Sequence, residues 1–402
     1  MADGSDALPV ESVVWLMTGH ERYGVLRAVT TLAGGLRQAG VSVAAVVLED
    51  GPAVAAVESV GLETRVLGLG KAPAFSGGLL TKAAGVVKGW RYRRRAVPEV
   101  VAALREMGGG VLQVLWPNLV GLAAQAASEA GQRCVWEMPN TLSSALPFDV
   151  NRWLYRRACR RYGVLVLANS AYTGASLAGG GADGVEPVTF HLGVDPGVFD
   201  PSSVDPMTRA ELGIPNGAVV LGVVARLDPS KGQDRLWEAV LGQVRGGVDL
   251  HLLVLGGPTD GELAGRMVSA AESAGQRDRL HLLGRVEEPQ RYYGAMDVAV
   301  NSRVDPEPFG LSVVEGLMMG VPTLVHALGG PAETVSDGMT GWHITDPSVP
   351  GFEAGLTRVL ADRQRWPEMG RAARVEALKR FSVGAQVDRY FRALRAAFGG
   401  SA

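Results

Sequence analysis

Short runs of apolar, mostly β-branched residues alternate with longer segments of helical spacing along most of this 402-residue chain. The runs lack the polar–apolar alternation of half-exposed strands, so we expect strands buried on both faces, as in a parallel sheet. Intervening stretches such as 25–39 and 119–130 have the length of crossover helices. The expected strands are Val13–Met17, Val41–Leu48, Val111–Leu115, Val164–Leu167, Val219–Val224, Leu250–Leu255, Leu280–Leu283 and Val298–Val300.

A segment rich in Pro, Asp and Ser, residues 195–207, divides these strands into two series. Such a composition is typical of turns and linkers. We therefore predict an α/β protein with two doubly wound, Rossmann-like domains, residues 1–194 and 195–382, which face a central cleft. Residues 383–398 have the spacing of an amphipathic helix and are a candidate to pack back on the first domain.

The charge and the cysteine content exclude several classes of protein. The 39 basic and 41 acidic residues give a formal net charge of −2, which excludes a strongly basic nucleic-acid-binding protein. Two cysteines, Cys134 and Cys159, are too few for a disulfide framework or a four-cysteine zinc site. We see no signal-peptide pattern and no apolar stretch of ~18 residues, so we expect a cytoplasmic protein, with the inner face of the membrane as an alternative location.

The segment Asn301–Gly320 carries the most specific local pattern. A strand ends near Asn301, and a loop with two prolines follows, which delays helix formation until about Phe309. Gly310 permits a close backbone approach, and Gly320 ends the helix. The free N–H groups and partial positive charge at the start of this helix predict a site for an anion such as a phosphate.

Two carboxylates flank that helix start, Glu307 in the loop and Glu315 on the helix. A carboxylate can accept hydrogen bonds from both hydroxyls of a sugar or ribose diol. The alternative is structural, with Glu307 in solvent and Glu315 in a salt bridge. Asp305 and Glu307 also have a spacing that some divalent-metal sites use, although the chain has no Asp-x-Asp there.

A second charged turn follows the strand that ends at Val224. This strand delivers Arg226 to the carboxyl edge of its sheet, and Pro229 to Gly232 turn the chain into a helix near Gln233. Arg226 and Lys231 are then able to face the same crevice as the Phe309 helix start. Two cations beside a helix start suit a diphosphate leaving group. The alternative is two solvated cations on a surface turn.

Together these segments resemble retaining glycosyltransferases of family 4, which have the GT-B fold and a Glu-x7-Glu motif, here Glu307 to Glu315. The resemblance covers about residues 10–398 and is dense in residues 185–345. Further segments that resemble the family are Val321–Trp342, Val224–Gly232, Leu283–Val286 and His191–Phe199.

The resemblance implies an enzyme that moves a sugar from a nucleoside diphosphate sugar to a hydroxyl acceptor with retention, without metal or other cofactor. Family habit favours UDP over GDP. Glu315 would bind the ribose and Glu307 the donor sugar. Arg226 and Lys231 would hold the diphosphate. The remaining donor-side residues implied by the family are Phe309, Gly310, Leu311, Arg285, Val286 and Gly19.

The first domain gives a softer signal. Thr18–Gly24 forms a loop before an expected helix at Val25, and Gly19 and Gly24 match the family's glycine-rich loop. His20 is a candidate for proton transfer, or a solvent-facing side chain. Leu115 stands where family members often carry a donor-contacting His. Acceptor-side candidates by position alone are Trp116, Asn118, Glu137 and Asn140.

Two basic segments, Lys88–Arg95 and Arg152–Arg161, interleave arginines with aromatic residues. Such a pattern fits a helix at a membrane interface, or a helix with a solvated arginine face. If the helix lies at a membrane, a lipid is a candidate acceptor. Independently of this, a polysaccharide intermediate and a bacterial natural product are further candidate acceptors. Alternatives to a transferase are a nucleotide-sugar-binding protein without activity, motivated by Leu115, and a sugar-nucleotide 2-epimerase or dehydrogenase.

Overall fold

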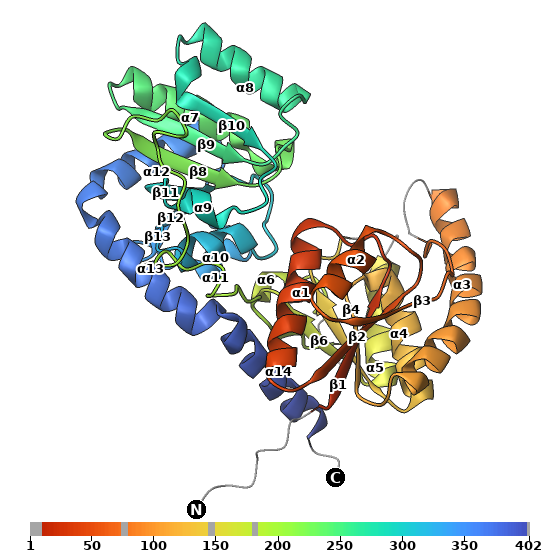
Figure 1. Ribbon diagram of the computed structural model, residues 1–402. Coiled ribbons are helices and arrows are strands. Elements are labelled where there is room, and N and C mark those ends of the chain that lie inside the picture. The colour runs from red at the N-terminus through yellow and green to blue at the C-terminus, as the bar shows by residue number, and fades with distance from the viewer. Residues whose placement is uncertain (1–9, 74–78, 144–148, 179–183, 400–402) are drawn as a thin grey trace, which may run out of the picture. The chain divides into compact units, whose positions relative to one another are not determined.

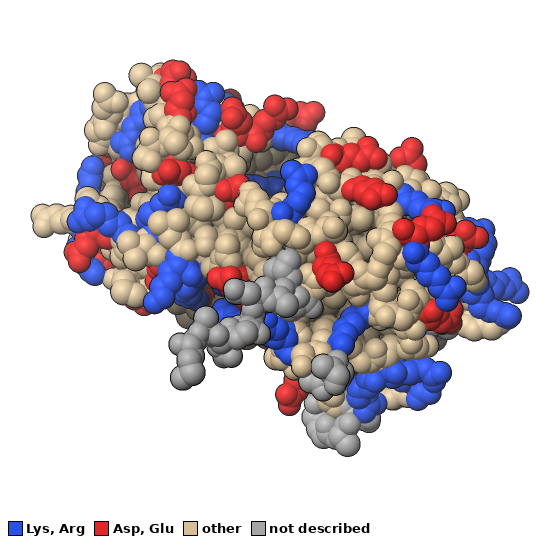
Figure 2. Space-filling model, turned by 60° about the horizontal axis from the view of Figure 1, so that its bottom comes forward, with Lys and Arg blue, Asp and Glu red and all other residues tan. Residues whose placement is uncertain are grey.

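The computed structural model describes residues 10–73, 79–143, 149–178 and 184–399. The chain forms two compact units. Unit 1 comprises Met1–Gly193 and the C-terminal segment Val383–Ala402, and unit 2 comprises Val194–Ser382. Each unit is built on its own parallel sheet (Figure 1). Basic and acidic side chains are interspersed over the face drawn in Figure 2, in keeping with the small net charge.

The sheet of unit 1 has the strand order β3-β2-β1-β4-β5-β6-β7, and the β3-to-β6 part has the order of a Rossmann sheet. Its pairs are parallel, and Val13 lies between Val43 and Val111. The strands are β1 Ser12–Met17, β2 Ser42–Val47, β3 Glu63–Val66, β4 Val111–Val114, β5 Arg133–Met138, β6 Leu165–Ala168 and β7 Val188–Thr189. The helices are α1 Tyr23–Gln38, α2 Pro52–Ser59, α3 Leu79–Glu106, α4 Pro117–Ala130, α5 Val150–Tyr162, α6 Ala171–Ala175 and α14 Val383–Phe398.

Both faces of this sheet are buried, as the continuous apolar runs predict. Val14 and Leu16 of β1 pack into a core with α3, α4 and α5. Val13 and Trp15, which point to the opposite face, pack into a core with α1, α2 and α14. The C-terminal helix is therefore a structural part of unit 1. Among the described residues, no helix combines the length and apolar character needed to cross a bilayer.

A buried polar chain links α14 to the centre of the unit 1 sheet. The Tyr390 hydroxyl donates to Gln113 Oε1 over 2.7 Å, and the Gln113 amide donates to the Glu137 carboxylate. Glu137 is 2% exposed, and this burial raises its pKa from 4.5 to about 7, although the Gln113 hydrogen bond opposes the shift. The protein core, and not solvent, surrounds this carboxyl group.

We expect the Glu137→Gln variant to lose a pH dependence of stability that the wild type has. The folded state keeps the Glu137 proton up to a pH of about 7, whereas the unfolded chain releases it near 4.5. The contribution of Glu137 to the free energy of unfolding therefore falls by about 3 kcal/mol as the pH rises through this interval. Denaturant titrations at several pH values give the free energy of unfolding of the wild type and of the variant. Burial lowers the pKa of His281 to about 4, which gives the opposite pH dependence in both proteins, and this contribution cancels when the two free energies are subtracted. Parallel pH profiles would contradict the assignment.

The sheet of unit 2 is also parallel, with the order β10-β9-β8-β11-β12-β13. Its strands are β8 Val219–Val224, β9 Leu250–Leu255, β10 Leu280–Gly284, β11 Val298–Asn301, β12 Thr323–His326 and β13 Gly341–Ile344. Its helices are α7 Gln233–Arg245, α8 Glu262–Ser273, α9 Gln290–Tyr293, α10 Leu311–Met318, α11 Pro331–Thr334, α12 Val349–Ala361 and α13 Trp366–Phe381, with a 3-10 turn at Pro229–Lys231. The predicted class of two Rossmann-like domains is thus confirmed, and α10 begins within two residues of the expected start.

Candidate functional site

The turn between β8 and α7 presents two cations from a rigid frame. Asp228 accepts hydrogen bonds from the Ser230 hydroxyl (2.6 Å) and backbone N–H (3.0 Å), which lower the pKa of this carboxyl group. Gln233 Nε2 donates to the Arg226 carbonyl over 2.7 Å. The Arg226 guanidinium lies 3.7 Å from Asp228, and 54% of its side chain is exposed. Lys231 ends the 3-10 turn that Asp228 caps.

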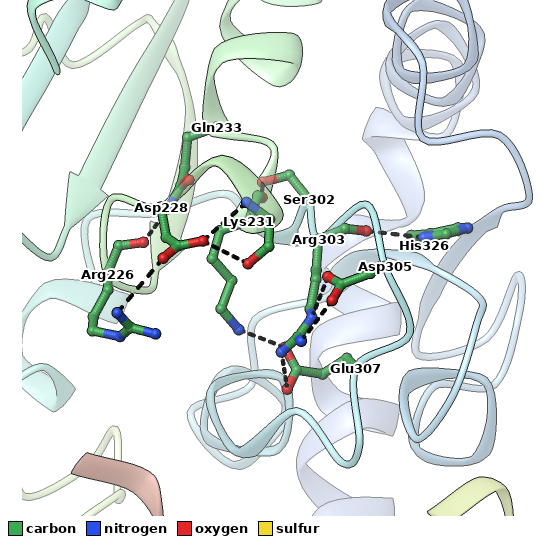
Figure 3. Close-up of polar contacts among 10 residues, drawn as sticks. Arg226, Asp228, Lys231, Gln233, Ser302, Arg303, Asp305, Glu307 and His326 are labelled. Carbon is green, nitrogen blue, oxygen red and sulfur yellow. Dashed lines mark hydrogen bonds and ion pairs between the residues drawn. The ribbon is translucent and has the colours of Figure 1, made fainter. Parts of the chain in front are cut away.

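Lys231 points at Glu307, which the chain places 76 residues later. Lys231 Nζ lies 2.7 Å from Glu307 Oε2, and the Arg303 guanidinium lies 3.2 Å from Oε1 of the same carboxylate. Arg303 also forms two hydrogen bonds with Asp305, of 2.8 and 3.0 Å, which lower the pKa of Asp305. We call Lys231, Arg303, Asp305 and Glu307 the charged cluster. Figure 3 shows Lys231 and Arg303 converging on Glu307, with Arg226 beyond Asp228.

The start of α10 is built by close backbone packing. Gly310 precedes the helix with a φ of +85°, a conformation that glycine adopts without strain. Phe309 is 2% exposed and packs edge-on against Phe381 at 6.2 Å between ring centres. A Cβ on Gly330 would lie 2.4 Å from the Phe309 Cα atom, so only glycine fits against this loop. Leu311 is the first helical residue.

Glu315 lies in the middle of α10 and is 1% exposed. The Tyr293 hydroxyl lies 3.4 Å from Glu315 Oε2 and 3.0 Å from the Ser312 carbonyl oxygen. The side chain is thus held inside unit 2, whereas Glu307 keeps 14% of its side-chain surface. Arg285 and Val286 follow the end of β10, and Arg285 is exposed.

The predicted donor-side residues of unit 2 thus follow the carboxyl ends of several parallel strands of one sheet, whereas Gly19 follows β1 of unit 1. Arg226 follows β8, Arg285 follows β10, and Glu307 follows β11. In open parallel sheets, ligands bind at this edge. The residues predicted from the sequence did not include Arg303, Asp228 and Tyr293. Arg303 had a detectable signal, because it precedes Asp305 by two residues and Glu307 by four.

The loop after β1 is organised by Glu21, which sequence reasoning also missed. Its buried carboxylate accepts hydrogen bonds from Thr18 N (2.8 Å), Gly19 N (3.0 Å) and Trp116 Nε1 (2.9 Å). Trp116 therefore has an interior hydrogen-bond partner. His20 Nε2 lies 2.8 Å from Glu49 Oε1, and 39% of its side chain is exposed.

The other acceptor-side candidates differ in accessibility. Asn118 Nδ2 donates to the Pro73 carbonyl over 3.2 Å. Asn140 is exposed at the end of β5. Glu137 instead belongs to the buried polar chain under α14. It therefore does not lie at the surface, where an acceptor would contact it. Leu115 is 1% exposed, and its carbonyl accepts from Trp136 Nε1 over 3.0 Å.

Gly19 and Gly24 provide a matched pair of alanine substitutions. Gly19 has a φ of +93°, and a Cβ there would lie 2.1 Å from the Glu49 carbonyl oxygen. We expect Gly19→Ala to cost about 2 kcal/mol or more of unfolding free energy. Gly24 has no neighbour within 4 Å of such a Cβ and lies at the start of α1, so Gly24→Ala should be neutral or stabilising by up to about 1 kcal/mol. Equal effects in denaturant unfolding would contradict this account of the loop.

Within the described residues, no group of three or more His, Cys, Asp or Glu side chains is placed to hold a metal ion. Asp305 and Glu307, the pair with metal-like spacing, both contact Arg303. That the reaction needs no metal stays a prediction.

The two units, each built on a parallel sheet, together have the GT-B fold. A glycosyltransferase from Rickettsia africae has the same fold, with a TM-score of 0.81, 15% identity, and coverage of 97% of this chain and 100% of that one. HepE of Anabaena, solved in complex with UDP, has a TM-score of 0.78 and 20% identity, and the match covers 96% of this chain and 100% of HepE.

Similarity at the sequence level gives a more specific result. Residues 205–376 match the family described as Glycosyl transferases group 1. The D-inositol 3-phosphate glycosyltransferases of Segniliparus rotundus and Mycolicibacterium smegmatis are each 33% identical, over 52% and 49% of this chain. These matches cover 47% and 44% of the relatives, so the chain spans about half the length of the curated relatives that it matches. These matches support the resemblance over part of the chain, and the Glu-x7-Glu assignment stays a prediction.

Proposed function

We propose that the chain is a retaining glycosyltransferase that takes its sugar from a nucleoside diphosphate sugar and passes it to a hydroxyl acceptor. The observation that carries this proposal is the charged cluster, which follows parallel strand ends in the unit that matches the group 1 family. UDP is the preferred nucleotide of the proposal, and the UDP complex of HepE supports that choice.

The roles follow from charge and position. Arg226 and Lys231 neutralise the charge that develops on the leaving diphosphate, which is the largest contribution that such a site makes to catalysis. When the donor binds, Lys231 leaves Glu307 and pairs with a phosphate oxygen of the donor. Arg303 keeps its contact with Glu307, so the carboxylate stays oriented to accept hydrogen bonds from hydroxyl groups of the donor sugar. Glu315 accepts hydrogen bonds from the ribose diol.

The remaining parts of the proposal concern the acceptor. Unit 1 contributes the acceptor-side loops, with His20 and Asn118 as candidates. The names of the curated relatives make a phosphorylated cyclitol one acceptor to test beside lipids, polysaccharide intermediates and natural products. No metal or other cofactor takes part.

A nucleotide-sugar-binding protein without transferase activity is the second candidate. It is favoured by Leu115, which is buried where family members often carry a donor-contacting His. Both candidates need the donor site, and they differ in turnover alone.

Thermal-shift titrations with UDP, GDP and their sugars test the common part, because a ligand that binds only the native state raises the melting temperature. We expect one nucleoside diphosphate sugar to raise it and the bare nucleoside to have a much smaller effect. Product analysis by NMR then separates the candidates: transfer with the donor's anomeric configuration supports the enzyme, and donor binding without turnover across the acceptor panel supports the binding protein. No shift with any nucleotide would refute both.

A further inference from the structure

Helices α3 and α5 of unit 1 carry matching outward faces. On α3, Val87, Trp90, Arg91 and Arg94 are exposed and are spaced three or four residues apart. On α5, the exposed set Val150, Trp153, Leu154, Arg157 and Arg161 has the same spacing. Residues at this spacing lie on one side of a helix. Each helix therefore presents a tryptophan and an aliphatic side chain together with arginines.

The tryptophans are unusually open to solvent for their size. Trp90 is 57% exposed and Trp153 is 43% exposed. An arginine one turn later covers part of each ring: the Arg94 guanidinium lies 4.8 Å from the Trp90 ring centre, and Arg157 lies 5.4 Å from that of Trp153. The exposed aliphatic residues beside them are Val87 (52%), Val150 (40%) and Leu154 (40%). Exposed aromatic and aliphatic residues grouped in this way mark an interaction surface.

The two faces belong to one helical layer. Helix α4 lies between α3 and α5 and packs on the same side of the sheet (Figure 1). Arg93 of α3 lies across α4, where it donates to Gln125 over 2.8 Å and reaches the Tyr162 hydroxyl of α5 at 3.5 Å. Gly121 makes room for it, because a Cβ there would lie 2.9 Å from Arg93 Nη1. The three helices thus form a continuous support.

We propose that this surface, formed by the outward faces of α3 and α5, binds an anionic lipid bilayer. Helix α5 contains no Asp or Glu, and α3 contains none before Glu99. Between them, α4 carries one exposed acidic residue, Glu129, which accepts a hydrogen bond from Gln125, so the arginines of α3 and α5 still leave the surface positive beside its apolar groups. Tryptophan and arginine side chains have an apolar body and a polar end, which suits the headgroup region. Anionic lipids attract each basic residue near the surface by about 1 kcal/mol, or about fivefold in partitioning.

Other occupants fit these observations less well. A nucleic acid would use the arginines but leave Val87, Val150 and Leu154 in water. A second copy of the chain would bring arginines against arginines. The inference does not depend on the proposed function, because neither helix contributes to the charged cluster of unit 2.

Co-sedimentation of the full chain with vesicles tests the proposal. We expect binding to phosphatidylcholine vesicles that contain phosphatidylglycerol, little binding to phosphatidylcholine alone, and a loss of binding as salt is raised. The triple variant Arg91→Gln/Arg94→Gln/Arg157→Gln should bind roughly 100-fold more weakly at low salt. Trp90→Ser/Trp153→Ser should also lose most binding, and its loss should persist at low salt.

Helix α13 supplies matched controls. Arg371→Gln/Lys379→Gln removes exposed charge, and Val375→Ser/Leu378→Ser removes side chains that are 67% and 39% exposed; both should bind vesicles like the wild type. The proposal is overturned if the wild type binds neither vesicle, if controls and test variants lose binding equally, or if the surface variants lose binding to a DNA duplex while vesicle binding is unaffected. The salt and lipid dependence of the wild type decides the question if a variant does not fold.

Discussion

Replacing Lys231 by alanine should lower kcat/KM for sugar transfer by about 10²- to 10³-fold, the usual cost of removing one group that stabilises developing negative charge. The ammonium group, on the last residue of a 3-10 turn, pairs with Glu307, and in the proposed complex it pairs with the diphosphate instead. The fold should persist, because Arg303 continues to neutralise Glu307. Initial-rate kinetics with saturating acceptor and varied donor measure the effect.

The control for this variant is Lys379→Ala, which removes an exposed lysine of α13 in the same unit. Its kinetics and melting temperature should match the wild type. If Lys231→Ala retains more than about a tenth of the wild-type kcat/KM, the diphosphate does not depend on this lysine. A large fall in melting temperature without ligand would instead assign Lys231 a structural role beside Glu307.

Replacing Glu315 by glutamine should weaken donor binding by about 10- to 100-fold, because a charged acceptor of two hydroxyl hydrogen bonds becomes a neutral group with one acceptor oxygen. Glutamine has nearly the same shape, and its oxygen can still accept from Tyr293. Calorimetric titration with the nucleoside diphosphate measures the loss. A nucleotide without the ribose hydroxyls should bind wild type and variant equally.

Tyr293→Phe separates ligand contact from support. It removes the hydroxyl that lies 3.4 Å from Glu315 but leaves the carboxylate in place. We expect a loss of no more than about threefold in donor affinity, since one neutral hydrogen bond of this kind contributes little. Equal losses in Glu315→Gln and Tyr293→Phe, with both nucleotides, would show that Glu315 acts within the core only.

The strands that sequence reasoning predicted are those whose burial leaves a continuous apolar run, such as β8 Val219–Val224 and β9 Leu250–Leu255, which match residue for residue. The strands that were not predicted include some whose apolar run is interrupted by polar residues. Strand β5 contains Glu137, which is buried through Gln113, and β3 lies at a sheet edge with Glu63 exposed. Single-sequence periodicity does not distinguish such strands from loops.

The parts of the site that lie within one short segment were predictable from the sequence. The contacts between side chains from distant segments were not. The position of Gly310 before α10 followed from two prolines and a glycine. The contact between Lys231 and Glu307 joins residues 76 positions apart. In unit 1, the role of Glu21 depends on Trp116, 95 residues later. No local sequence pattern predicts contacts between residues so far apart in the chain.

A crystal structure of the protein with the nucleoside diphosphate sugar selected by thermal shift tests the central claim most directly. The account predicts both ribose hydroxyls within hydrogen-bond distance of the Glu315 carboxylate, the diphosphate against Arg226 and Lys231, and the sugar hydroxyls on Glu307, which Arg303 still contacts. A nucleotide bound elsewhere, with the Lys231–Glu307 pair intact, would contradict it.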